Sequence, residues 1–341
     1  MTRKESTMRR QNNPAQRLQA ALQTLGDAKY HHRHPFNLLM HAGRLTASDL
    51  RLWVANRYYY QTRIPIKDAL IVAKSEDPHF RRAWLQRIID HDGPSERTTP
   101  PEASNHREVP RGGLKLWQEL GRACGIRKED LDAHRWVIPA ARQVCDEYVE
   151  LVRGADLLTA VASSLTEYFA GSILQVRLDA WKAHYPWVPP EALSYFECRL
   201  AKAPADAEYA LKFLELQLHT DEQFERCLHA VERKCDILWR LLDVVYLESR
   251  RRRVPRLTGR VALYSAEPPA SALLLAPEKG YELNETGHAL LELCKDEQPL
   301  EELARRLAQQ YQGQPETVLA EMAPFVAELE RRRVIEFAPE L

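Results

Sequence analysis

The stretch from Trp53 to Asp68, WVANRYYYQTRIPIKD, decides the fold of this chain. Upstream of it, Thr46 is a suitable N-cap, and apolar residues from Leu50 onward follow helical spacing. Arg57 and Gln61 are four residues apart and therefore share one face of the predicted helix. This pattern favours a polar cluster that faces inward. For this segment alone, a solvated edge with extended Arg and Tyr side chains is an equal alternative.

Pro65 lies inside the same stretch and predicts that the helix ends or kinks there, with Lys67 just beyond the break. The chain up to residue 253 otherwise has helical periodicity and almost no alternating strand pattern. Gly26 marks the predicted end of the first helix. We therefore predict an all-α bundle with further helices near residues 14–26, 78–91, 113–124, 139–153, 163–181 and 221–253, and a short helix around residues 195–199.

Two of these helices repeat the polar pattern of the first. Arg87 and His91 are one pair four residues apart, and Tyr195 and Arg199 are another. One such pair on an apolar face is ordinary. Three pairs on separate helices predict a polar pocket in the core of the bundle.

The predicted helix at 163–181 adds a carboxylate and a guanidinium to this picture. Glu167, Leu174 and Arg177 fall on one face of it. Charged side chains on an apolar face need partners, so structural ion pairing and ligand binding are equally good explanations.

The net charge differs between the two parts of the chain. Lys and Arg together number 48, as do Asp and Glu, so the whole chain is neutral. From Val254 onward there are 9 basic and 15 acidic residues, which leaves residues 1–253 with a net charge of +6. A basic first part favours an anionic ligand. Without a long basic run, nucleic acid is a poor candidate.

The cysteines and the apolar runs predict a cytoplasmic protein that does not cross a membrane. The six cysteines lack paired metal-site spacing and are typical of reduced, buried thiols. Residues 1–10 are basic, but no apolar core follows them, so we do not expect a secretory signal. We expect no apolar run that approaches the ~18–20 residues that a bilayer requires.

A different pattern begins at RRRRVPR, residues 250–256, which we interpret as a charged, proline-containing hinge. Short strands are predicted over 260–283, with turns near 267–269 and 277–280. Three helices and a last strand, VIEF, follow. We predict two domains, 1–250 and 251–341. The second is an independently folding α+β module of winged-helix type, with acidic character that argues against DNA binding.

Metal chemistry is poorly supported by the sequence. A di-iron bundle needs two Glu-x-x-His motifs on inward faces, and the only such spacing, Glu285 and His288, lies in the small domain. The turn YHHRHPF, residues 30–36, is rich in imidazole, but a metal there is expected at about one chance in ten because metal ligands converge from several segments. A nucleophilic thiol also lacks an obvious partner. A metal-free pocket for a polyanion fits the cations best.

Several motifs resemble the pyrroloquinoline quinone synthase (PqqC) family, in order and spacing. They are RYYYQTRIPIKDA at 57–69, RIIDHDG at 87–93, SSLTE at 163–167 followed by Arg177, HYPW at 184–187 and YFECRL at 195–200. The resemblance covers about residues 15–250. It implies a bundle of about seven helices related to the thiaminase and haem-oxygenase folds. It also implies ring closure and dioxygen-dependent oxidation of a hexahydroquinoline polycarboxylate, with release of hydrogen peroxide. This is the last step of pyrroloquinoline quinone biosynthesis and is implied to need no metal or organic cofactor.

Residues 254–341 resemble PqqD, a small peptide chaperone, through VPRL at 254–257, the segment 274–294 and ERRRVIE at 330–336. This second resemblance implies binding of a ribosomal precursor peptide and of the pathway's radical enzyme. We also expect the protein to form a homodimer and to bind neither nucleic acid nor a membrane.

The resemblance implies specific roles for the polar residues. The expected catalytic residues are His91, Tyr195 and Arg199. The expected substrate-binding residues are Tyr30, His31, Arg57, Tyr60, Gln61, Lys67, Arg87, Tyr148, Glu167, Arg177 and Lys234.

This chain departs from the family pattern in two places. Many members have a histidine seven residues after the SSLTE glutamate, and this chain has Leu174 there. The proline-rich loop at 94–111 also looks longer than the usual connection. A thiaminase-like hydrolase and a non-catalytic binding scaffold are the alternatives. The hydrolase would need a positioned Cys or carboxylate nucleophile.

Overall fold

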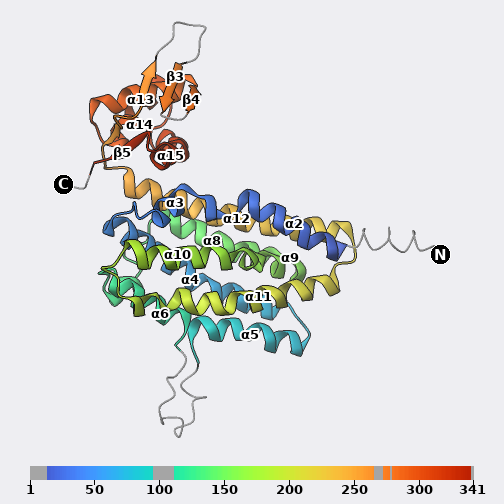
Figure 1. Ribbon diagram of the computed structural model, residues 1–341. Coiled ribbons are helices and arrows are strands. Elements are labelled where there is room, and N and C mark those ends of the chain that lie inside the picture. Colours follow the sequence, from blue (N-terminus) through green and yellow to red (C-terminus); the bar gives the residue numbers. More distant parts are fainter. Residues whose placement is uncertain (1–13, 95–110, 265–271, 277–278, 339–341) are drawn as a thin grey trace. The chain divides into compact units, whose positions relative to one another are not determined.

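The computed structural model describes residues 14–94, 111–264, 272–276 and 279–338 (Figure 1). The predicted long loop at 94–111 lies almost entirely outside the described residues. The chain divides into two compact units, Met1–Leu241 and Leu242–Leu341. This division falls inside one helix, upstream of the domain boundary predicted after residue 250.

The first unit is the predicted all-α bundle (Figure 1). Its longest inner helix, α4, packs against α5, α6 and α8. The α-helices are α2 (Pro14–Lys29), α3 (Pro35–His41), α4 (Ala47–Ala73), α5 (Pro78–Asp92), α6 (Gly113–Ala123), α7 (Lys128–Asp132), α8 (Pro139–Gly154), α9 (Leu157–Ala162), α10 (Ala170–His184), α11 (Ser194–Gln217) and α12 (Asp221–Arg250). Short 3₁₀ segments are η1 (His31–Arg33), η3 (Ser163–Phe169) and η4 (Pro190–Leu193).

Helix α4 begins at the predicted cap and continues through Pro65. Thr46 accepts a hydrogen bond from the backbone N–H of Asp49 at 3.2 Å, and Asp49 accepts one from Thr46 at 2.9 Å, which forms a capping box. Of the two outcomes predicted at Pro65, an end of the helix is wrong, and a kink stays a prediction. Proline removes one backbone donor, but Ile64, Pro65, Lys67 and Asp68 are buried, so packing outweighs the local cost. Lys67 therefore remains on the same continuous helix as Gln61.

Helix α2 runs past Gly26, so the predicted end at that glycine is also wrong. A Cβ atom at Gly26 would lie 2.4 Å from Cε1 of Phe169. The glycine thus allows a close approach of the Phe169 ring, which also contacts Tyr30 with ring centroids 5.2 Å apart. Similarly, the helix that carries Tyr195 is longer than predicted and continues to Gln217.

Four aromatic rings fill the core near the polar residues. Trp53 lies on α4 with its ring centroid 5.6 Å from that of Trp117 and 6.0 Å from that of Trp181. Phe196 completes the cluster at 5.8 Å from Trp181. Contacts at these distances between fully buried rings stabilise the bundle beyond simple burial of their area.

The stretch Leu157–His184 is long and apolar enough to cross a membrane, by length and composition alone. It consists of α9, η3 and α10 in succession, and 50% of its apolar window is buried inside the structure. It also carries Glu167 and Arg177. Buried core segments pass the same test, and we describe this stretch as one of them.

The second unit has the predicted α+β composition. Strands β2 (Ala262–Tyr264), β3 (Ala272–Ala276) and β4 (Lys279–Leu283) form an antiparallel sheet in that order. Strand β1 (Pro255–Leu257) pairs with β5 (Ile335–Phe337). The helices are α13 (Glu285–Leu293), α14 (Leu300–Gln310) and α15 (Pro315–Arg331), with a 3₁₀ turn η5 (Cys294–Asp296) after the first.

The arginine-rich segment at 250–256 is built into the second unit, so its interpretation as a free hinge is wrong. Arg250 is buried and its Nε donates to Glu330 on α15 at 3.0 Å. Tyr246 donates to the same carboxylate at 2.9 Å. The carbonyl of Arg253 accepts a hydrogen bond from the N–H of Leu300 at 3.0 Å. The charge and proline content of this segment predicted that it would be exposed to solvent. The structure shows instead that these partners bury part of it.

Candidate active site

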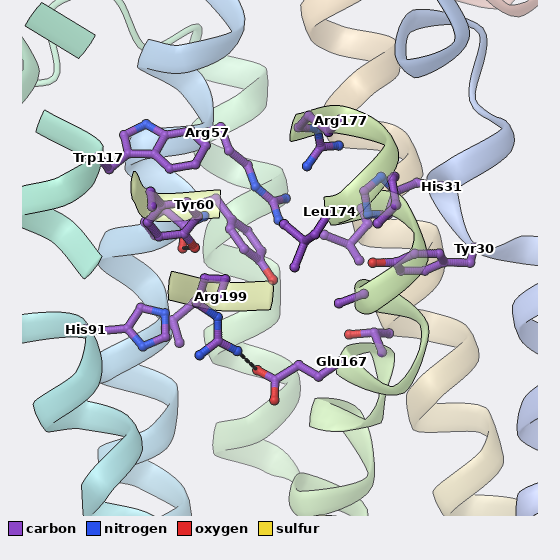
Figure 2. A pocket seen from close by; sticks show the side chains of 17 residues that line it. Tyr30, His31, Arg57, Tyr60, His91, Trp117, Glu167, Leu174, Arg177 and Arg199 are labelled. Atoms are coloured by element: carbon purple, nitrogen blue, oxygen red, sulfur yellow. Dashed lines mark hydrogen bonds and ion pairs between the residues drawn. The ribbon is translucent and has the colours of Figure 1, made fainter. Parts of the chain in front are cut away.

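A cavity of about 80 Å³ lies among the helices of the first unit. Figure 2 shows side chains from several helices pointing into it. Of the predicted site residues, the following line it: Tyr30, His31, Arg57, Tyr60, Gln61, His91, Glu167, Arg177, Tyr195 and Arg199. The structure therefore brings together side chains that are up to 169 positions apart in the sequence, as three polar pairs on separate helices predicted.

The other four predicted residues lie behind this lining. Tyr148 stacks on Tyr60 with ring centroids 6.2 Å apart, and the amine of Lys234 lies 4.2 Å from the ring centroid of Tyr60. Lys67 donates to Ser164 at 2.8 Å. Arg87 donates to the lining residue Glu167 at 2.6 Å. None of these four residues lines the cavity itself. Tyr148, Lys234 and Arg87 contact residues that do.

Two carboxylates that the sequence analysis missed hold the inner cations. Asp68 pairs with Lys67 at 2.6 Å and with Arg87 at 3.4 Å. Asp206 pairs with Arg199 at 3.0 Å. Asp68 follows Lys67 directly in the sequence, and a buried lysine needs an anion, so it could have been found. Nothing in the sequence around Asp206 indicates its role.

Three cations differ from this paired set. Among the described residues, Arg57, Arg177 and Lys234 form no ion pair with a carboxylate. The guanidinium of Arg57 lies 4.0 Å from the ring centroid of Tyr60, and Arg177 donates to the side chain of Asn37 at 3.2 Å. These three residues, which we call the unpaired cations, lie in or beside the cavity lining without a carboxylate partner among the described residues.

The charge states of the unpaired cations follow from their burial. Burial lowers the pKa of Arg177 to about 10, and the charge of Arg57 acts in the same direction. Arg177 therefore stays protonated at neutral pH. Burial, with Arg57 and Lys67 nearby, holds the pKa of Lys234 well below its usual range. The Lys234 amine makes no hydrogen bond within the described part of the chain and lies 3.3 Å from the ring centroid of Tyr148.

His91 presents an unprotonated nitrogen in this site. Its Nδ1 lies 3.0 Å from the carbonyl oxygen of Arg87. A carbonyl only accepts hydrogen bonds, so Nδ1 carries the proton and donates, and Nε2 carries the lone pair. Nε2 is buried and has no hydrogen-bond partner among the described residues. Burial, followed by the charge of Arg199, lowers the pKa of His91 to about 4, so the ring is a neutral base at pH 7.

His31 and Asn37 form a second fixed arrangement. Asn37 Oδ1 accepts from Arg177, so its amide nitrogen donates to Nδ1 of His31 at 3.0 Å. The proton of His31 therefore lies on Nε2. Burial, with Arg57 and Arg177 next, lowers the pKa of His31 well below its usual value. Asn37 is the residue directly after the imidazole-rich turn. An asparagine at that position did not by itself indicate a site residue, so the sequence analysis missed it.

The phenols of the site remain protonated. Tyr195 donates to Gln61 at 2.9 Å, and its ring meets that of Trp117 edge-on with centroids 4.7 Å apart. Burial raises the pKa of Tyr195, and Arg199 opposes that change only in part. Burial likewise raises the pKa values of Tyr30 and Tyr60. Each phenol therefore offers a hydrogen-bond donor to the cavity or its lining.

The apolar lining was largely missed by the sequence analysis. Leu174, noted there as a departure from the family pattern, does line the cavity. The lining residues that were not selected are Ile64, Trp117, Thr166, Ala170, Ile173 and Leu238. Apolar residues on a helix face look alike in sequence whether they line a cavity or pack in a core.

No three His, Cys, Asp or Glu side chains converge as a metal site would require, within the residues that the structure describes. In the imidazole-rich turn, Nδ1 of His34 accepts from the N–H of Phe36 at 3.0 Å and Nδ1 of His31 accepts from Asn37. Both nitrogens thus have protein partners.

Comparisons with known proteins agree with this geometry. Residues 19–244 match the TENA/THI-4/PQQC family, and residues 271–335 match the family described as coenzyme PQQ synthesis protein D (PqqD). The bifunctional coenzyme PQQ synthesis protein C/D of Methylorubrum extorquens is 31% identical over an alignment of 363 positions that covers 94% of this chain and 94% of the relative. The pyrroloquinoline-quinone synthase of Klebsiella pneumoniae is 41% identical over 240 residues, 70% of this chain and 90% of the relative.

Solved structures show the same fold at low sequence identity. A domain with a heme oxygenase-like fold from Shewanella denitrificans aligns with a TM-score of 0.52 at 14% identity, covering 69% of this chain and 90% of that one. A TenA homolog from Pseudomonas syringae aligns with a TM-score of 0.51 at 15% identity, covering 67% and 91%. The chain belongs to the TENA/THI-4/PQQC family and carries a PqqD region after its helical bundle.

Proposed function

We propose that the first unit is a pyrroloquinoline-quinone synthase, which oxidises a quinoline polycarboxylate with dioxygen. Arg57 and Arg177 carry this proposal, because positive charge in the cavity lining without a carboxylate partner among the described residues favours an anionic ligand. The relatives with that name add support, since they match the helical bundle at about 40% identity. A cytoplasmic location and a homodimer stay predictions.

The residues around the cavity suit each part of this reaction. Arg57 and Arg177 bind carboxylates of the substrate, and Nε2 of His91 accepts a proton from it. The reduced, electron-rich form of the substrate gives two electrons and two protons to dioxygen, one of the protons by way of Nε2 of His91, and hydrogen peroxide leaves. Arg199 donates hydrogen bonds to the oxygen species as negative charge develops on it, and Tyr195 does so when its O–H turns from Gln61.

We infer that the reaction needs neither a metal nor an organic cofactor. The support is the chemistry of the lining, where Arg57, Arg177 and Arg199 would repel a metal cation. Purified protein supplied with the hexahydroquinoline polycarboxylate in air should form the quinone, seen by its absorbance, and hydrogen peroxide. The same reaction without dioxygen should stop, and a chelator should leave it unchanged. Activity that follows bound iron or copper would contradict the cofactor-free reaction.

The two alternatives predict different results in that assay. A thiaminase-like hydrolase needs a nucleophile, and the cavity lining contains no cysteine among the described residues. Burial would raise the pKa of Glu167, but Arg87 and Arg199 together lower it to about 2, which makes it a poor nucleophile. A binding scaffold would retain the ligand and form no quinone.

Alanine at either of two unpaired cations should weaken substrate binding. For Arg57→Ala and Arg177→Ala we expect the loss of about 1.5–3 kcal/mol of binding free energy per lost charged hydrogen bond. The dissociation constant, measured without dioxygen, should therefore rise roughly 10–150-fold. Arg63→Ala is the matched control, because Arg63 lies on the same helix α4 and pairs with Asp146 away from the cavity. Binding as tight as that of the wild-type protein in both variants would contradict the pocket assignment.

We further propose that the second unit binds a ribosomal precursor peptide and the radical enzyme that acts on it. A groove of about 630 Å³ supports this, because it lies beside β4 and its apolar lining includes Leu283, Leu290 and Phe325. A peptide can add to the free side of β4 through main-chain hydrogen bonds while the groove holds its side chains. Calorimetric titration of the full chain with the precursor peptide should show binding that His91→Asn leaves unchanged. No heat of binding, with or without the radical enzyme, would contradict the chaperone role.

A further inference from the structure

Four charged side chains close a ring beside the cavity. Arg87 on α5 pairs with Glu167 on η3 at 2.6 Å, and Glu167 pairs with Arg199 on α11 at 3.5 Å. Arg199 pairs with Asp206 on the same helix at 3.0 Å, and Asp206 lies 3.7 Å from Arg87. Figure 2 marks the pair between Arg199 and Glu167. We call these four residues the ion-pair ring.

The ring is electrically balanced, in contrast to the unpaired cations. Two guanidinium groups face two carboxylates, so the ring as a whole adds no attraction for an anionic ligand. Its geometry instead fixes the orientation of the Arg199 guanidinium. One end of the Arg199 guanidinium is held by Asp206 and the other faces Glu167, so the group cannot rotate without breaking a contact.

The ring also reaches His91. The side chain of Arg87 belongs to the ring, and the carbonyl of the same residue accepts the hydrogen bond that places the proton on Nδ1 of His91. Arg199 lines the cavity together with His91. Two groups that face the reacting molecule are thus supported by one network, and Asp206 is a member of it that does not line the cavity.

We propose that Asp206 is a positioning residue for this reaction, which holds the Arg199 guanidinium toward the cavity and keeps the ion-pair ring neutral. This inference rests on the proposed oxidase function. Without the Asp206 charge, Arg199 has Glu167 as its remaining carboxylate partner in the ring, and the guanidinium can rotate about that one contact. The ring then carries a net positive charge, which favours an anionic ligand.

Asp206→Asn tests this because it keeps the size of the side chain and removes its charge. We expect kcat to fall roughly 10–10²-fold, as for a misplaced catalytic group. We expect the dissociation constant of the substrate, measured without dioxygen, to stay the same or decrease. Asp206→Glu, which keeps the charge, should recover part of kcat. A general loss of structure would weaken binding and turnover together and would not respond to the conservative change.

Lys202→Gln is the matched control. Lys202 on α11 pairs with Asp90 on α5 at 2.6 Å, so this variant breaks an ion pair between the same two helices without touching the ring. It should leave both constants unchanged. An equal loss of kcat in Lys202→Gln and Asp206→Asn would overturn the inference, as would full kcat in Asp206→Asn.

The assay separates this inference from the proposed function. An inactive wild-type protein would overturn both, whereas an active wild-type protein with an equally active Asp206→Asn variant would overturn the inference alone. If Asp206→Asn does not fold, Asp206→Glu provides the comparison, because it displaces the charge by one methylene. A lower kcat with unchanged binding in that variant supports positioning, and unchanged kcat overturns it.

Discussion

Replacing His91 with Asn is expected to slow quinone formation by roughly 10²–10⁴-fold, the usual contribution of a general acid or base. Substrate binding should change only a few-fold. The reason is the neutral ring of His91, whose Nδ1–H donates to the carbonyl of Arg87 and whose Nε2 is buried without a partner among the described residues. Asn can keep a hydrogen bond to that carbonyl, but it has no nitrogen lone pair that accepts a proton near neutral pH.

His79→Asn is the control for this experiment, because His79 is exposed in the first turn of the same helix α5. It should behave as the wild-type protein. Turnover of His91→Asn at the wild-type rate would show that His91 is structural. A large loss of substrate binding in His91→Asn would assign it to ligand binding instead.

The pH profile gives an independent check on His91. Its pKa of about 4 in the folded protein lies below the usual value near 6.5. The base form is therefore present above about pH 4 and is lost only as the pH falls through that value. We expect the acid limb of kcat/KM, which reports the free enzyme, near pH 4. A limb near pH 6.5 that disappears in His91→Asn would contradict the buried, neutral ring.

Replacing Glu330 with Ala is expected to destabilise the second unit by about 3–5 kcal/mol, the usual cost of breaking a buried ion pair from one side. Glu330 accepts hydrogen bonds from Arg250 at 3.0 Å and from Tyr246 at 2.9 Å. The Arg250 side chain is only 1% exposed, so water cannot replace the lost carboxylate. Urea denaturation followed by circular dichroism measures the change.

Two further variants identify the cause of that destabilisation. Glu328→Ala removes a carboxylate from the surface of the same helix α15, where it pairs with Arg331, and should cost less than about 1 kcal/mol. The double change Arg250→Met with Glu330→Leu removes both buried charges and should be more stable than Glu330→Ala. A double variant as unstable as the single one would point to lost packing instead of an unpaired charge.

The same contacts set the limits of a separately expressed second unit. A fragment that begins at residue 242 keeps Tyr246 and Arg250, and one that begins at residue 254 loses both partners of Glu330. We therefore expect residues 242–341 to be the more stable fragment. The structure moves the useful boundary upstream of the predicted one because a buried carboxylate needs its partners.

Local patterns in the sequence were sufficient for the positions of most helices and for several polar residues of the cavity lining. Helical periodicity and the cap at Thr46 depend on residues within a few positions of each other, and α4 begins where they predict. Polar side chains on apolar helix faces, such as Arg57 with Gln61, selected residues that do meet in the cavity. The family resemblance added Tyr30 and His31 to that selection. These two residues lie in a turn, where helical periodicity makes no prediction.

Only the tertiary structure decided which charges are paired and which are not. Arg87 and Glu167 are 80 positions apart, and Arg87 and Asp206 are still farther apart in sequence. A Coulomb interaction depends on distance in space and on burial, and neither is encoded by local spacing. For the same reason the sequence could not show that α4 continues past Pro65 because of its packing. Nor could it show that Arg250 is buried and pairs with Glu330. The residue types were visible in the sequence, but their protonation states and partners followed from the packing of helices distant in sequence.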